Sequence, residues 1–227
     1  MEPTQWIKEE TLTLDFGDKR LNTRLKKTLE RLSSSPEKSI PSATKGWSET
    51  QGTYRLLNNP KVHSEKILSP HRAATLRRIQ QESIVLIPQD TTEIDLTHRK
   101  PMEDMGYLSS SKSQGFYIHP SVAFTPERCC LGTVNLQSWV RKELGTSKKR
   151  KEKPIEEKES YNWVKGYEAA NDIAKLAPNT VVVSISDREG DIYDVLEKER
   201  NEENKAYWLI RSQHNRTILN EDTQTRL

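Results

Sequence analysis

Two short aliphatic runs, each followed by an aspartate, constrain the fold of this chain more than any other feature. Residues 84–87 (Ile-Val-Leu-Ile) and 181–185 (Val-Val-Val-Ser-Ile) are rich in β-branched side chains and bounded by turn-forming residues. The first run predicts a strand buried on both faces of a sheet, and the second predicts a further aliphatic strand. Asp90 and Asp187 come just after the two runs, and a helical pattern over residues 163–176 precedes the second run. Parallel strands with a crossover helix are therefore expected.

The remaining patterns of the second half complete an α/β order of elements. Residues 115–124 and 130–139, separated by Pro126-Glu127, predict a strand pair folded as a hairpin. A short helix over 191–200 and a strand over 206–211 follow residue 187. The succession strand, strand, strand, helix, strand, helix, strand is that of a ribonuclease-H-like mixed sheet without its closing helix. We expect this partial core over residues 81–211, and the start of an insertion or a disordered tail over 212–227.

The first third of the chain predicts a small all-helical domain, residues 1–80. Leucines at positions 21, 25, 29 and 32 share one helical face, and a second row beside them carries the cations Arg20, Arg24, Lys27 and Arg31. We expect the leucines to pack and the cations to stay exposed. Ser48 and Gln51 predict a capping box for a helix that runs to residue 58, and Ser69-Pro70 predicts the start of another through residue 81.

Charge is distributed unevenly along the chain. Residues 1–80 carry 15 Lys and Arg against 9 Asp and Glu, whereas the rest carries 21 against 24. A basic front end before a mildly acidic body suits a polyanion-binding module joined to a carboxylate-bearing catalytic one, or is a simple fluctuation of charge. Residues 148–159 are almost wholly charged and predict a mobile, solvated connector, with a nuclear-import or nucleic-acid patch as the alternative for its basic run.

Several classes of protein are disfavoured by composition. The apolar runs are too short to span a bilayer, and the first residues form no signal sequence, so no membrane association and a cytoplasmic location are expected. The two cysteines, Cys129 and Cys130, are adjacent, whereas a disulfide framework or thiolate metal site needs spaced partners. We expect both thiols to be reduced.

Asp90 and Asp187 are the candidate catalytic and metal-binding residues. Functional groups gather beyond the carboxyl ends of parallel strands, so the two carboxylates are expected to converge. Oxygen-only ligands suit Mg²⁺ or Mn²⁺, which can activate a water or a DNA 3′-hydroxyl for displacement at phosphorus. The alternative for each aspartate alone is that it caps a turn or a helix.

The local sequence around these two aspartates resembles the acidic motifs of the insertion-sequence-4 family of DDE transposases. The two acidic motifs are Gln-Asp-Thr-Thr at residues 89–92 and Asp-Arg-Glu-Gly-Asp-Ile-Tyr at 187–193. Ordered matches to the family's helical and strand segments lie at residues 16–25, 49–60, 115–119 and 207–216. The resemblance covers nearly the whole chain.

The resemblance implies a cut-and-paste DNA transposase that acts on double-stranded DNA at transposon ends. It implies metal ligation by Asp90 and Asp187, and either a homodimer in a synaptic complex or pairing with full-length transposase. The DNA-contact candidates are Arg20, Arg24, Lys27, Arg31, Lys38, Tyr54 and, more weakly, Arg211. For the basic row the physical reason is that exposed cations neutralise phosphates without reading bases; the alternative is a solvated helix face.

One departure from the family pattern leaves the activity open. The family's third acidic residue lies in a late Tyr-Arg-Glu signature on the closing helix, and no such signature occurs before Leu227. The expectation is therefore an amino-terminal fragment with an incomplete catalytic triad, inactive alone. The alternative is a non-catalytic DNA-binding relic or inhibitor of intact transposase. A haloacid-dehalogenase-type phosphatase with Asp90 as nucleophile is disfavoured, because Thr92 stands where its second aspartate belongs.

Overall fold

The computed structural model describes residues 3–100, 102, 104–110, 112–143, 154–198, 206–219 and 224–226 of the 227-residue chain. The chain divides into two compact units, Met1–Arg77 and Arg78–Leu227. Across the described ranges, no helix combines the length and the apolar character that crossing a bilayer requires.

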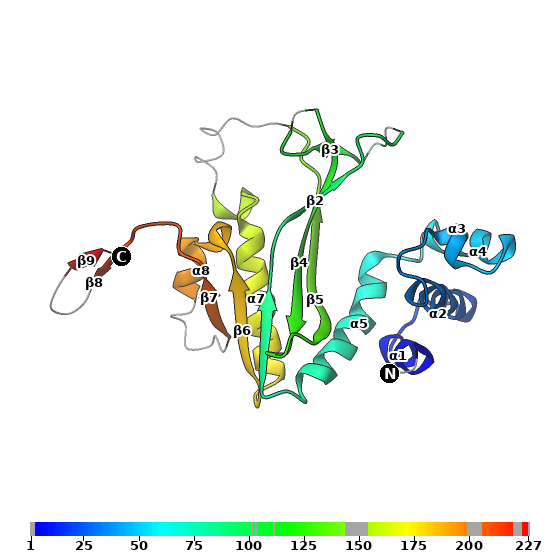
Figure 1. Ribbon diagram of the computed structural model, residues 1–227, viewed down its shortest axis with the longest axis horizontal. Helices are drawn as coiled ribbons and strands as arrows, with labels where there is room; N and C mark the ends of the chain where they lie inside the picture. The colour runs from blue at the N-terminus through cyan, green and yellow to red at the C-terminus, as the bar shows by residue number, and fades with distance from the viewer. Residues whose placement is uncertain are drawn as a thin grey trace. The chain divides into compact units, whose positions relative to one another are not determined.

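The amino-terminal unit is helical, as the leucine spacing predicts. Its helices are α1 (Pro3–Glu10), α2 (Lys19–Ser33), α3 (Ile40–Ala43), α4 (Trp47–Leu57) and α5 (Ser64–Ile79), the last of which continues past the end of the unit (Figure 1). The core of the unit consists of the buried residues Leu14, Phe16, Leu25 and Leu56, against which Leu21, Leu29, Val62 and Ile67 pack. Three leucines of the predicted face of α2 therefore take part in this core.

Two predicted helix starts are wrong. The capping box of Ser48 and Gln51 does not form, because α4 begins at Trp47 after Gly46, whose φ of 82° is a left-handed conformation that favours glycine. Helix α5 begins at Ser64 rather than at Ser69, and Pro70 lies inside it. A proline inside a helix removes one hydrogen bond to the preceding turn. Pro70 is buried, so its ring packs inside the protein although that hydrogen bond is missing.

Seven strands of the second unit form one mixed sheet, with β5, β4, β1, β6 and β7 side by side (Figure 1). Strands β1, β6 and β7 run parallel, whereas β4 is antiparallel to both β1 and β5. This order is ribonuclease-H-like and confirms the predicted fold class. The elements are β1 (Ile84–Pro88), β2 (Thr92–Asp95), β3 (Gly106–Tyr107), β4 (Gln114–Phe124), β5 (Cys130–Trp139), α7 (Tyr161–Leu176), β6 (Val181–Ser186), α8 (Tyr193–Lys198) and β7 (Tyr207–Ile210).

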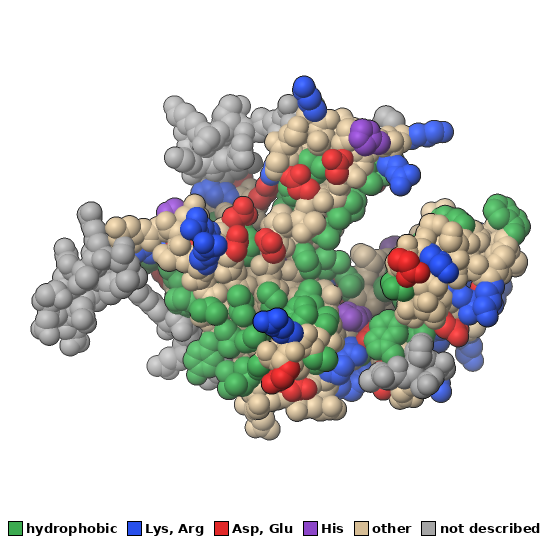
Figure 2. All heavy atoms as spheres, in the orientation of Figure 1, with side chains coloured by type: hydrophobic (Ala, Val, Ile, Leu, Met, Phe, Trp, Pro, Cys, Tyr) green, Lys and Arg blue, Asp and Glu red, His purple; other side chains and the backbone are tan. Residues whose placement is uncertain are grey.

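The two faces of the sheet differ in what covers them. Helix α7 packs on β4, β5 and β6, and the side chains that face it, such as Val85 and Val182, are buried. On the other face Val181, Tyr207 and Leu209 are exposed, and Figure 2 shows hydrophobic side chains gathered there over β6 and β7. The alternating burial along β1 therefore differs from the prediction of a strand buried on both faces.

Several short elements have no counterpart in the sequence prediction. Strand β2 continues the path of β1 along β4, and β3 pairs with the start of β4. Two 3-10 turns, η1 (Ile155–Glu157) and η2 (Arg188–Gly190), flank α7 and β6 respectively. Strands β8 (Thr217–Leu219) and β9 (Gln224–Arg226) pair in the segment for which we expect an insertion or a disordered tail. The basic run at 148–151 lies outside the described residues.

Candidate functional site

The register of β1 and β6 places Asp90 and Asp187 side by side. The parallel pairing runs from Ile84 opposite Val181 to Pro88 opposite Ile185, and the Gln89 amide donates to the Ile185 carbonyl at 3.0 Å. Asp90 and Asp187 each follow two residues after this last pair, so they occupy matching positions beyond adjacent parallel strands. Both are exposed, and Figure 2 shows acidic side chains gathered at this end of the sheet.

Each of the two carboxylates accepts a backbone hydrogen bond with one oxygen. Asp90 Oδ1 accepts from the Thr91 amide at 2.7 Å, and Asp187 Oδ1 accepts from the Glu189 amide at 2.8 Å and caps η2. Among the described residues, no hydrogen bond to the second oxygen of either carboxylate is formed. The capping alternative thus holds for one oxygen of Asp187, and among the described residues the second oxygen of each carboxylate is available to a ligand.

Negative charge accumulates around these carboxylates. Burial, together with the negative charges of Asp187 and Asp90, raises the pKa of Glu189 above its usual range. Two carboxylates, each with one oxygen that accepts no hydrogen bond from the described residues, fit the donor chemistry of Mg²⁺ or Mn²⁺. A cluster of three or more Asp, Glu, His or Cys side chains arranged to hold a metal does not occur in the described parts of the chain.

A buried histidine that the sequence analysis did not single out contacts both chain neighbours of Asp90. His119 of β4 has no exposed surface; its Nδ1 lies 2.8 Å from Thr91 Oγ1 and its Nε2 lies 3.0 Å from Gln89 Oε1. Its ring packs edge-on against Trp163 of α7, with 4.7 Å between the centroids. Burial lowers the pKa of His119 to about 4, although the charge of Asp90 opposes this, so the ring is neutral near pH 7.

Two nearby carboxylates, Asp191 and Glu93, have structural roles. Burial would raise the pKa of Asp191, but hydrogen bonds from the Gln213 and His214 amides at 2.7 and 2.8 Å, and the Arg216 guanidinium, lower it. Hydrogen bonds from Ser109, first from its side chain and also from its amide at 2.9 Å, lower the pKa of Glu93. Asp191 therefore orders the segment after β7, and Glu93 joins β2 to the segment after β3.

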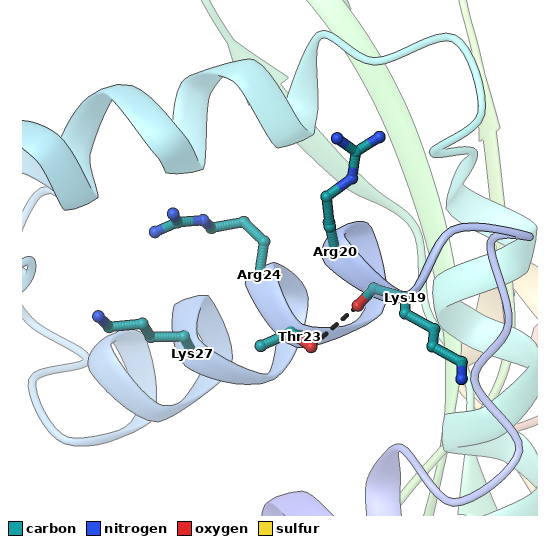
Figure 3. Close-up of a pocket in the computed structure, with 5 residues that line it drawn as sticks. All are labelled: Lys19, Arg20, Thr23, Arg24 and Lys27. Atoms are coloured by element: carbon teal, nitrogen blue, oxygen red, sulfur yellow. Dashed lines mark hydrogen bonds between the residues drawn. The ribbon is translucent and has the colours of Figure 1, made fainter.

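The predicted basic row lies along α2 of the amino-terminal unit, with its members in different environments. Figure 3 shows Arg20, Arg24 and Lys27 leaving successive turns of α2, and these residues line one surface hollow with Lys19 and Thr23. The side chain of Arg20 is 91% exposed and pairs with the helix-capping Asp18 at 3.0 Å.

The far end of the row is paired within the protein, and the partial burial of Arg31 there corrects the prediction that all four cations stay exposed. Glu49 of α4 accepts from Lys27 at 2.7 Å, from Arg31 at 2.9 Å and from the Lys45 amide at 2.9 Å. The side chain of Arg31 is only 18% exposed. These contacts, led by that of Arg31, hold the pKa of Glu49 well below its usual range. Lys27 and Arg31 therefore join α2 to α4.

Arg24 lies against α4 at Gly52. A Cβ at position 52 would stand 2.6 Å from the Arg24 Cζ, so the guanidinium rests on the bare backbone of the glycine. Of the other candidates in this unit, Lys38 is exposed after α2, and Tyr54 is 45% exposed on α4. In the second unit, Arg211 is exposed and its amide donates to the Ser186 carbonyl at 3.2 Å, beside Asp187.

Comparison with known proteins finds a family model that matches the amino-terminal unit. Residues 3–62 match the family model described as "Transposase DNA-binding". The matched region extends from α1 to the segment after α4 and contains the whole basic row. The amino-terminal unit is thus similar to the DNA-binding domains of transposases.

Among solved structures, the chain is similar to a transposase described as "Cryo-EM structure of piggyBac transposase synaptic complex with hairpin DNA". The TM-score is 0.41 at 11% sequence identity, over 94% of this chain and 44% of that one. This chain thus spans less than half the length of that protein. With so low a score, the ribonuclease-H-like assignment rests on the strand order and not on this match.

Proposed function

We propose that this protein is a cut-and-paste DNA transposase of the insertion-sequence-4 type. Its amino-terminal unit binds double-stranded DNA at transposon ends, and its ribonuclease-H-like unit carries Asp90 and Asp187 for metal-dependent cleavage and strand transfer. The observation that carries the catalytic half is the parallel register of β1 and β6, which sets two exposed carboxylates at matching positions. The match over residues 3–62 supports DNA as the partner.

The chain's own residues divide the chemistry between them. Asp90 and Asp187 would each offer to Mg²⁺ or Mn²⁺ the carboxylate oxygen that accepts no hydrogen bond from the described residues. When bound, such a metal supplies an activated water or 3′-hydroxyl and stabilises the leaving oxygen. Arg211, exposed beside Asp187, would contact a DNA phosphate. As a synaptic complex requires two DNA ends, we propose a homodimer or pairing with full-length transposase as the working assembly.

On the amino-terminal unit, the proposed DNA surface is centred on the first half of α2. Arg20 is almost fully exposed and Arg24 lies close to it on the next turn, so both can reach phosphates. Lys38 and Tyr54 are exposed in the same unit and extend the proposed contacts beyond α2. These are backbone contacts and give affinity and salt dependence more than sequence preference.

A second candidate is a DNA-binding protein without nuclease activity, an inhibitor or relic. It is favoured by the number of carboxylates, because two aspartates supply few of the ligands that two-metal phosphoryl transfer needs. In the described part of the chain, no third Asp, Glu, His or Cys side chain is arranged with them to hold a metal. For residues 1–227 alone we therefore expect DNA binding without efficient cleavage.

The test combines binding and cleavage on the same preparation. The full chain, with Mg²⁺ or Mn²⁺, should retard duplex DNA with an affinity that falls steeply with salt, and should leave supercoiled plasmid uncut. Asp187→Ala serves as the matched variant for contaminating nuclease. Absence of duplex binding at low salt would refute the proposed partner. Robust plasmid cleavage that disappears in Asp187→Ala would refute the incomplete site and point to Glu189 as the missing carboxylate.

A further inference from the structure

His119 connects the two residues that flank Asp90 in the chain. Strand β4 keeps one register against β1 and its continuation β2: Leu86 pairs with Phe124 and Thr92 with Ile118, so Thr91 lies opposite His119. The two ring nitrogens of His119 then contact Thr91 on one side of Asp90 and Gln89 on the other, at 2.8 and 3.0 Å.

The contact has a definite donor pattern. Gln89 Nε2 donates to Ser184 Oγ at 3.2 Å, which directs its Oε1 to His119 Nε2. The histidine must therefore donate from Nε2, and its Nδ1 accepts from the Thr91 hydroxyl. The neutral ring thus uses one donor and one acceptor, and each has a partner.

The network also joins Asp90 to the strand that carries Asp187. Ser184 lies in the middle of β6, three residues before Asp187, and bonds to Gln89, which is adjacent to Asp90. The side chain of Gln89 fills space that exists because residue 166 of α7 is glycine: a Cβ there would stand 1.7 Å from Gln89 Oε1. Strands β1, β4 and β6 and helix α7 all contribute to this arrangement.

Asp90 has few restraints of its own at this point. Its amide donates to the Pro120 carbonyl over a long 3.4 Å, and Pro88 and Pro120 cannot donate hydrogen bonds to the ladder. The pairing with β6 ends at Gln89, whereas the pairing with β4 continues through Asp90. The side-chain bonds of Gln89 and Thr91 therefore supply the restraint that the weakened ladder lacks.

We propose that His119 is a positioning residue, which holds the Asp90 carboxylate in line with Asp187 through Gln89 and Thr91. This inference rests on the proposed function of Asp90 as a metal ligand. It assigns no contact between His119 and metal or DNA. Partners behind metal ligands typically change metal affinity by about 10- to 100-fold when removed.

The experiment is a calorimetric titration of the full chain with Mn²⁺ at pH 7. Thr91→Val removes the hydroxyl with almost no change of shape, and His119→Phe removes both ring bonds. We expect Mn²⁺ affinity to fall about tenfold in Thr91→Val and at least as far in His119→Phe. Val134→Ala, at a buried position of β5 outside the network, is the matched control for loss of packing and should keep wild-type affinity.

The outcomes separate this inference from the proposed function. If Asp90→Ala does not weaken Mn²⁺ binding, the metal site itself is wrong. If Asp90→Ala abolishes binding while Thr91→Val retains wild-type affinity in a folded protein, the positioning role of His119 is wrong. Equal losses in Thr91→Val and Val134→Ala would also contradict it, because the effect would then follow stability alone. Thermal melting of each variant shows whether it is folded.

Discussion

Acidification should destabilise this protein through His119, and the size of the effect follows from its burial. The folded-state pKa is about 4, against 6.5 for an unperturbed histidine. As the pH falls below 6.5, the unfolded chain binds a proton at this residue while the folded protein does not. The contribution of the neutral histidine to stability is therefore complete above pH 6.5 and declines as the pH falls toward 4.

The expected magnitude can be worked from the two pKa values. Full titration across the gap of about 2.5 units corresponds to on the order of 3 kcal/mol, and the interval from pH 7 to pH 5 to about 2 kcal/mol. Other groups titrate in the same range, so the comparison needs a variant that lacks only this one. His119→Gln cannot titrate and keeps a hydrogen-bonding amide.

Urea unfolding followed by tryptophan fluorescence at pH 7 and at pH 5 measures the difference, and Trp163 reports on the ring that it contacts. Between these two pH values the wild-type protein should lose about 2 kcal/mol more free energy of unfolding than His119→Gln. Equal losses in the two proteins would show that His119 titrates normally, and the buried neutral ring would then be refuted.

The remaining predictions concern the cations of the amino-terminal unit. Glu49→Gln should release Lys27 and Arg31, strengthen binding to duplex DNA and steepen the plot of log affinity against log salt by up to about 1.8, or about 0.9 for each new phosphate contact; an unchanged slope in a folded variant would contradict this. Arg20→Ala combined with Arg24→Ala should weaken binding and flatten the slope by up to about the same amount. Wild-type affinity and slope in that double variant would show that the row is a solvated face.

Local sequence patterns predicted most of the fold because the strands and helices of the core are periodic. Leucine spacing indicated α2, and aliphatic runs indicated β1 and β6. Strand β2 was missed because Thr92–Asp95 is polar and becomes a strand only by pairing with β4. The start of α5 was misplaced because Pro70 favours a first turn, whereas the helix begins at Ser64 and Ile67, before the proline, packs against the core of the unit.

The site was predicted as far as the chemistry depends on strand ends. Two aspartates after parallel strands were expected to converge, and the register of β1 and β6 gives them matching positions; their role as metal ligands stays a prediction. Pairings between distant residues were not predictable: Glu49 gave no local signal that it would pair with Lys27 and Arg31 across helices. The pairing of Thr91 with His119 likewise depends on the register of β4. Hydrophobic alternation alone does not determine which residues of two strands lie opposite each other.

Residue-resolved paramagnetic broadening by Mn²⁺ tests the central claim most directly. The full chain, labelled with ¹⁵N, is titrated with Mn²⁺ beside the Asp187→Ala variant. We expect the amides next to Asp90 and Asp187 to broaden first and together, and that selective broadening to disappear in the variant. Broadening spread over other acidic segments, or unchanged by Asp187→Ala, would contradict a shared metal site at the ends of β1 and β6.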